Sequence, residues 1–105
     1  MFLGAEALSP ALVEQSIASV PAECRVFNMY GPTEATIISS VLEIQRDERQ
    51  KYRDLTYIPI GRAVGNNVLQ VMDRYMVLSP IGVTGEWSIG GDGGAEGYIN
   101  NPELT

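Results

Sequence analysis

The N-terminal half of the chain carries two apolar runs around one amphipathic segment, and this pattern predicts a strand, a helix and a strand. We expect a short buried strand over residues 2–7 and a second strand over residues 25–30. Between them, Ser9-Pro10 is typical of a helix start, with Ser9 as the N-cap, and Pro21 should end the helix. One face of this helix should pack on the sheet through Leu12, Val13, Ile17 and Val20. This order of elements favours a parallel pair of strands in an α/β sheet.

Residues 35–44 are rich in β-branched side chains and predict a third strand. A segment of interleaved acidic and basic residues follows up to about Leu55, which is typical of a solvated loop or short helix.

After Pro59 the pattern becomes that of short strands and turns. Residues 67–73 and 75–78 predict a hairpin around a tight turn at Asp73-Arg74. Residues 85–90 alternate polar and apolar side chains, the period of a half-buried strand, with Trp87 and Ile89 on the buried face. The glycine-rich run that follows departs from the dinucleotide fingerprint at Glu96, and we assign its glycines to tight turns.

These patterns divide the chain into an α/β unit over residues 1–58 and a β-rich unit over residues 59–105. Asn101-Pro102-Glu103 has the form of a helix start, with an N-cap, a first-turn proline and an acidic first turn. Because the sequence stops where this helix should begin, we expect a fragment of a longer protein.

Composition narrows the classes of function. The 105 residues carry a net charge of −6, which argues against a nucleic-acid partner, since such proteins present a basic face. The chain has no histidine and a single cysteine, so histidine-based catalysis and an internal disulfide are excluded within it. No apolar run approaches the ~20 residues of a membrane helix. We therefore expect a cytoplasmic protein without a membrane partner.

Residues 28–34, Asn-Met-Tyr-Gly-Pro-Thr-Glu, place a ring, a rigid turn, a hydroxyl and a carboxylate just after the second expected strand. Ligands of open α/β sheets bind at the carboxyl ends of the strands. A ring can stack on adenine for about 1–3 kcal/mol, and a carboxylate can hold Mg²⁺ beside substrate phosphates. The run predicts an ATP site, while a surface turn that closes a strand remains the alternative for a Gly-Pro pair.

Four motifs in the same order resemble the adenylation domains of nonribosomal peptide synthetases. They are residues 28–34, similar to the family's Asn-x-Tyr-Gly-Pro-Thr-Glu core, residues 3–8, residues 58–62, and residues 82–105 with their glycine-rich and Pro-Glu-Leu-Thr segments. The resemblance spans the whole chain. It implies a fragment of the large N-terminal adenylation subdomain, in which the end of a βαβ sheet unit precedes a small β-rich unit shaped as a distorted barrel.

The resemblance implies an enzyme that joins a small carboxylic or amino acid to AMP, using ATP and Mg²⁺, and releases pyrophosphate. The acyl group would then pass to phosphopantetheine on a peptidyl carrier protein domain, among other synthetase modules. By motif position, Asn28 binds the adenine amino group and Tyr30 stacks on the adenine ring, which Ala5, Glu6 and Ala7 frame through their backbone. The motif also implies that Thr33 contacts the α-phosphate and that Glu34 holds Mg²⁺. Thr33 and Glu34 are thus the implied catalytic residues.

The same resemblance implies an acyl pocket lined by Phe2, Gly4, Met29, Gly31, Ile37 and Ile38. Their side chains are apolar or absent, and an unpaired charge buried there would cost on the order of several kcal/mol. We therefore expect a hydrophobic or aromatic acyl side chain.

Some features depart from the family pattern and leave alternatives open. Ala5 stands where glycine is usual, and Trp87 stands where leucine is usual. The family's phosphate loop, ribose-binding aspartate and C-terminal lysine are not among these 105 residues, so the fragment alone should be inactive. An acyl-CoA or aryl-CoA ligase shares the Tyr-Gly-x-Thr-Glu core. A non-catalytic remnant, or a module for interdomain binding, is an alternative of another class.

Overall fold

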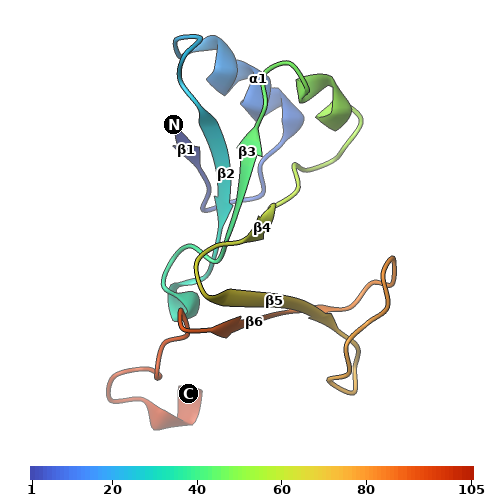
Figure 1. Ribbon diagram of the computed structural model, residues 1–105. Coiled ribbons are helices and arrows are strands. Elements are labelled where there is room, and N and C mark those ends of the chain that lie inside the picture. The colour runs from blue at the N-terminus through green and yellow to red at the C-terminus, as the bar shows by residue number, and fades with distance from the viewer.

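A computed structural model describes residues 1–105, and it shows a mixed α/β fold with two sheets (Figure 1). The four-stranded sheet has the order β1-β2-β3-β4, and its strands are Phe2–Leu3, Val26–Tyr30, Ser40–Ile44 and Arg62–Ala63. The two-stranded sheet pairs β5, Asn67–Met72, with β6, Glu86–Gly91. The helices are α1, Pro10–Ala18, and the 3₁₀ turns η1, Thr33–Ala35, η2, Arg49–Tyr52, and η3, Pro102–Leu104.

The expected strand–helix–strand unit is confirmed, and β1 pairs with β2 in parallel. The Ser9 hydroxyl accepts from the Leu12 amide at 3.3 Å and caps α1, as its sequence predicts. The helix ends at Ala18, before the end that Pro21 predicts. The expectation of a buried first strand was wrong. β1 covers only Phe2–Leu3, and Phe2 is 67% exposed because nothing covers that face of the sheet beside its stacking partner Phe27.

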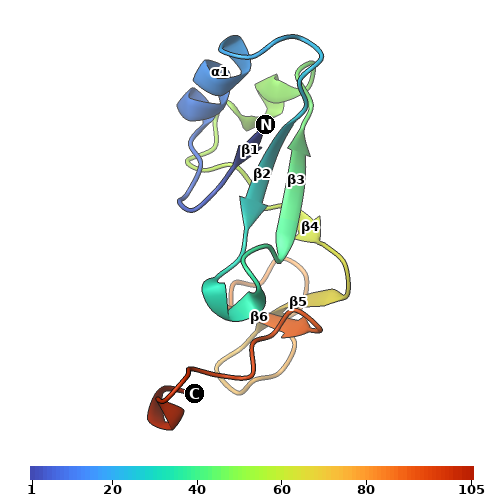
Figure 2. The same cartoon turned by 90° about the vertical axis from the view of Figure 1, so that its left-hand side faces the viewer.

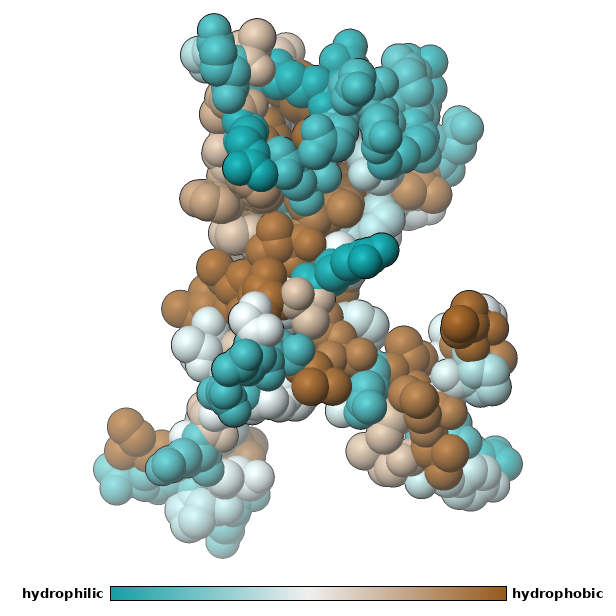
Figure 3. All heavy atoms as spheres, in the orientation of Figure 1, coloured by the Kyte–Doolittle hydropathy of each residue, from teal (hydrophilic) through white to brown (hydrophobic).

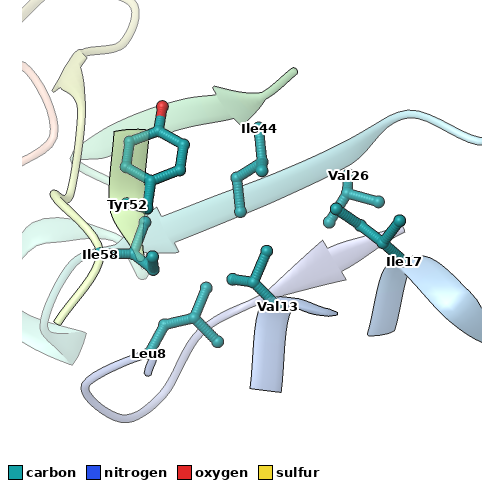
Figure 4. Close-up of a cluster of buried hydrophobic side chains, with 7 residues drawn as sticks. All are labelled: Leu8, Val13, Ile17, Val26, Ile44, Tyr52 and Ile58. Atoms are coloured by element: carbon teal, nitrogen blue, oxygen red, sulfur yellow. The ribbon is translucent and has the colours of Figure 1, made fainter. Parts of the chain in front are cut away.

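The hydrophobic core lies between α1, η2 and one face of the first sheet (Figure 4). It consists of Leu8, Val13, Ile17, Val26, Ile44, Tyr52 and Ile58. Burial of each aliphatic side chain contributes about 1.5–3 kcal/mol. Val20 packs against this core as expected, whereas Leu12 is 37% exposed and lies off the predicted face.

The third strand is shorter than its sequence predicts. It begins at Ser40 rather than at residue 35. The residues before it form the end of η1 and a turn in which Thr36 and Ile37 have left-handed backbone conformations. The reason is topological. Tyr30 and Ser40 face each other in an antiparallel pair, so residues 31–39 must reverse the chain and cannot extend.

The hairpin predicted around Asp73-Arg74 is present only as a short pairing. β5 pairs along its whole length with β6. The expected second arm pairs with the end of β5 through the bridge between Met72 and Leu78 and two flanking backbone hydrogen bonds of 2.8 Å, Asp73 to Val77 and Ser79 to Val71. The turn itself is present, because Asp73 Oδ1 accepts from the amides of Tyr75 and Val77 at 2.8 and 2.9 Å.

Two smaller expectations for this half were also wrong. Ser88 and Ile89 are both half-buried while Trp87 is 37% exposed, so β6 does not alternate as its sequence predicts. Asn101 precedes η3 without a side-chain capping bond, although Pro102 takes the first helical position as expected.

The β5–β6 hairpin lies across the end of the first sheet, next to η1 (Figure 2). The carboxyl ends of β1 and β2 point toward this junction. The division at residues 58 and 59 stays a prediction, and β4, which follows that point, pairs with β3. No helix has the length and apolar character needed to cross a membrane.

Arg46, which follows β3, forms hydrogen bonds with the end of α1 and the segment after it. Its guanidinium donates to the carbonyl groups of Ile17, Val20, Pro21 and Cys24 over 2.6–3.4 Å. The Ile17 carbonyl lies in the last turn of α1, where the backbone lacks intrahelical donors and favours a cation, and the other three lie in the segment that follows the helix.

Replacing Arg46 by methionine should therefore loosen α1. The substitution keeps an aliphatic side chain but removes donors to several carbonyls, and we expect the free energy of opening α1 to fall by about 2 kcal/mol. Hydrogen exchange of the amides in residues 12–19 measures this. Arg53→Met, at an exposed residue beyond η2, is the matched control. Equal protection in the two variants would contradict this role for Arg46.

Candidate active site

The turn between β2 and β3 holds the central part of the site. Gly31 packs so tightly that a Cβ there would lie 2.6 Å from the Ile37 carbonyl oxygen and 2.6 Å from the Ser39 nitrogen. The Ser39 amide donates to the Tyr30 carbonyl at 2.8 Å and closes the turn. Within it, η1 exposes the side chains of Thr33 and Glu34.

Thr33 and Glu34 open into a hollow of about 360 Å³, which we name the carboxylate hollow. Its other lining residues come from the C-terminal segment and are Ala95, Gly97, Tyr98, Leu104 and Thr105. The Tyr98 hydroxyl donates to Glu34 Oε1, and the Ala95 amide donates to the Glu34 carbonyl oxygen at 2.7 Å. Two segments far apart in the sequence thus share one site.

The hydrogen bond between Tyr98 and Glu34 shifts the pKa of both groups. The Tyr98 hydroxyl, together with a backbone amide, lowers the pKa of the Glu34 carboxyl from its ordinary value. The same bond raises the pKa of Tyr98. Both shifts favour a carboxylate and a neutral phenol, the forms that a cation ligand and its hydrogen-bond donor require.

A second hollow, of about 260 Å³, lies on the other side of the turn, and we name it the apolar hollow. It is lined by Phe2, Leu3, Gly4, Ala5, Met29, Gly31, Ile37 and Ile38. The structure therefore gathers all six residues that the sequence assigns to an acyl pocket, although that assignment itself stays a prediction. None of the eight carries a charge. Gly4 makes the close approach of β1 possible, since a Cβ there would lie 2.6 Å from the Met29 carbonyl oxygen.

The surface around this junction is apolar (Figure 3). Apolar side chains gather over the ends of the first strands next to η1, while the far end of the sheet is hydrophilic. Phe2 and Ile37 are among the exposed apolar residues here.

The residues predicted to bind adenine do not line one hollow, unlike those predicted for the acyl pocket. Tyr30 is 40% exposed at the end of β2, and Glu6 and Ala7 lie exposed in the loop after β1, beside Ala5. Asn28 is different, because it is 3% exposed and its Nδ2 donates to the Pro59 carbonyl at 2.9 Å. Its amide therefore ties β2 to the chain that leads into β4. Its contact with a nucleotide stays a prediction.

The donor set suits Mg²⁺ held jointly with substrate phosphates. No cluster of three or more carboxylate, cysteine or histidine side chains forms a metal cage in residues 1–105. Glu34 offers a single carboxylate at the rim of the carboxylate hollow. Mg²⁺ commonly takes one or two protein carboxylates and completes its shell with phosphates and water.

The sequence did not single out the residues that complete the carboxylate hollow. Tyr98 is 64 positions from Glu34, and Thr36 Oγ1 donates to the Gly93 carbonyl at 2.6 Å across 57 positions. No local pattern encodes such distant contacts. The only signal was the resemblance of residues 82–105, which include Tyr98, to a motif of the family.

Comparison with known proteins assigns the chain to a family. Residues 1–99 match the family described as AMP-binding enzyme. The chain is 43% identical over its full length to gramicidin S synthase 2 of Brevibacillus brevis, of which it covers 2%. It is 38% identical to tyrocidine synthase 3 of Brevibacillus parabrevis and covers 2% of that protein. The chain thus spans a small part of the curated relatives it matches.

Solved structures agree in fold. The chain is 40% identical, with a TM-score of 0.80, to holo-AB3403, a four-domain nonribosomal peptide synthetase bound to AMP and glycine. It is 27% identical, with a TM-score of 0.81, to PA1221, a protein containing adenylation and PCP domains. Both matches cover 99% of this chain, but 7% and 20% of those chains.

Proposed function

Because this chain belongs to the AMP-binding enzyme family, as part of an adenylation domain of the nonribosomal peptide synthetase kind, we propose that its protein activates a hydrophobic carboxylic or amino acid as an acyl-AMP. One observation carries the proposal. The turn between β2 and β3 has a carboxylate and a hydroxyl on one side and an uncharged apolar hollow on the other. Adenylate formation brings together a phosphate and an acyl side chain. The phosphate needs a hydroxyl and a metal-binding carboxylate, and a hydrophobic acyl side chain needs an apolar hollow.

The nucleotide would lie along the carboxyl ends of β1 and β2. The ring of Tyr30 stacks on adenine, and the exposed backbone of residues 5–7 frames its edge. Asn28 Oδ1, which accepts no hydrogen bond from the chain, takes the adenine amino group, while Nδ2 stays bonded to Pro59. The Thr33 hydroxyl donates to an α-phosphate oxygen. Each role uses an atom that the fold leaves available.

The reaction requires positioning and neutralisation of charge rather than a protein nucleophile. A carboxylate oxygen of the acid attacks the α-phosphorus, and the bond to pyrophosphate breaks. Bound Mg²⁺ would polarise the phosphate oxygens and offset their negative charge. Glu34 would hold that ion through its carboxylate, whose pKa the Tyr98 hydroxyl lowers.

The apolar hollow favours a hydrophobic acyl side chain. Phe2, Met29, Ile37 and Ile38 offer only carbon and sulfur to a ligand, and Gly4 and Gly31 add no side chain. A charged side chain in this hollow would lose its hydration without gaining a partner.

We place the chain in the large N-terminal subdomain of the adenylation domain, with β5 and β6 contributing to a distorted barrel. A carrier domain with phosphopantetheine would receive the acyl group, and PA1221, which contains adenylation and PCP domains, supports this partner. Other synthetase modules would be further partners. Use of ATP and the unpaired thiol of Cys24 support a cytoplasmic setting.

The proposed function predicts ATP–pyrophosphate exchange by the full-length protein. The assay uses a panel of apolar amino acids, their 2-keto analogues and aryl acids, and at least one acid should support exchange. Glu34→Gln should lower the rate by about 10–100-fold, because the isosteric amide binds Mg²⁺ poorly. Glu23→Gln, at an exposed carboxylate away from both hollows, is the control. Exchange that does not depend on an added acid, or no exchange with any acid of the panel, would contradict the proposal. Transfer of the acyl group to free CoA would favour a CoA ligase.

The apolar hollow generates a separate prediction about selectivity. Ile38→Glu should raise the KM for the preferred apolar acid by at least about tenfold, because a carboxylate would then face its side chain. The KM for ATP should change little. Leu55→Glu, at an apolar residue exposed outside the hollow, serves as the control. A substrate profile identical to that of the unaltered protein would show that Ile38 does not contact the acid.

A further inference from the structure

The contact between Tyr98 and Glu34 does more than join two segments. Glu34 lies on a three-residue 3₁₀ turn and is exposed, so its carboxylate would otherwise sample several rotamers. Fixing a glutamate side chain in one rotamer costs conformational entropy. In the structure a single side chain restrains it, because the Tyr98 hydroxyl donates to Oε1 and no other side chain donates to either carboxylate oxygen.

The segment that carries Tyr98 is itself fastened to the turn. The Ala95 amide donates to the Glu34 carbonyl at 2.7 Å, and Thr36 Oγ1 donates to the Gly93 carbonyl at 2.6 Å. On its other side, the Tyr98 amide donates to Thr105 Oγ1 at 3.0 Å. The phenol therefore approaches Glu34 from a backbone held on both sides.

We propose that Tyr98 is a positioning residue for the metal-binding carboxylate of Glu34. Its hydroxyl occupies Oε1 and directs the free oxygen, Oε2, into the carboxylate hollow, where the phosphates of the nucleotide would lie. Hydrogen bonds to a ligating carboxylate commonly determine its orientation and its affinity for the metal. The inference rests on the proposed function, in which Glu34 holds Mg²⁺.

The test compares Tyr98→Phe with the unaltered full-length protein. The substitution keeps the ring that lines the hollow and removes only the hydroxyl. Binding of Mn²⁺ in the presence of a non-hydrolysable ATP analogue, followed by electron paramagnetic resonance, reports metal affinity without turnover. We expect the Kd for Mn²⁺ to rise by about tenfold, and the Mg²⁺ concentration for half-maximal exchange to rise in parallel. The KM for the acid should stay unchanged, because Tyr98 lies outside the apolar hollow.

Two further variants separate positioning from a structural effect. Tyr75→Phe removes an exposed phenol in the segment between β5 and β6 and should leave the Kd for Mn²⁺ unchanged. Glu34→Asp withdraws the carboxylate by one methylene, so adding Tyr98→Phe to it should have a much smaller effect than Tyr98→Phe alone. A purely structural role would lower the melting temperature and act equally in both backgrounds.

Each negative outcome has a distinct meaning. A Kd for Mn²⁺ that is unchanged or lower in Tyr98→Phe would overturn the role of Tyr98, provided that the unaltered protein shows acid-dependent exchange. An equal effect in the Glu34→Asp background would overturn it as well. If the unaltered protein shows no acid-dependent exchange with the panel, the proposed function fails first.

Discussion

The close packing of Gly31 against residues 37–39 is the constraint from which the site follows. A side chain at position 31 would overlap the Ile37 carbonyl and the Ser39 amide, so only glycine allows the chain to fold back this tightly. The tight return brings Ser40 opposite Tyr30 and starts the antiparallel pairing of β3 with β2. Its cost is visible in Thr36 and Ile37, two β-branched residues with φ of 55° and 70° in the left-handed region.

This reversal also separates the two chemistries of the site. The first half of the turn presents Thr33 and Glu34 to the C-terminal segment, and the second half presents Ile37 and Ile38 to β1. Because both halves belong to one closed turn, the carboxylate and the apolar hollow have a fixed spatial relation. The distant bonds from Ala95 and Tyr98 then hold the turn from outside. A short segment can thus place polar and apolar groups on opposite sides without a large scaffold.

The sequence predicted those features that depend on local chemistry. Ser9-Pro10 marked the start of α1, and the apolar runs located β1, β2 and β5, because caps and periodicity act within a few residues. Prediction from the sequence failed where contacts with residues far along the chain determine the local structure. Residues 35–39 have strand-forming side chains but lie in a reversal that the pairing of β2 with β3 imposes. β5 pairs along its whole length with β6, while the nearer residues 77–79 pair only with its end. The six residues around the apolar hollow were named by resemblance to a family, whereas the contact of Tyr98 with Glu34 was missed because nothing near Tyr98 in the sequence points to Glu34.

The most direct test of this account is the kinetics of Gly31→Ala in the full-length protein. One added methyl group should displace both halves of the turn, so the KM for the acid and the Mg²⁺ concentration for half-maximal exchange should both rise, by about tenfold or more. Gly90→Ala is the matched control, since a Cβ there meets nothing within 4 Å. A folded Gly31→Ala protein in which only one of these quantities changes, or neither, would contradict the claim that a single tight turn positions both parts of the site.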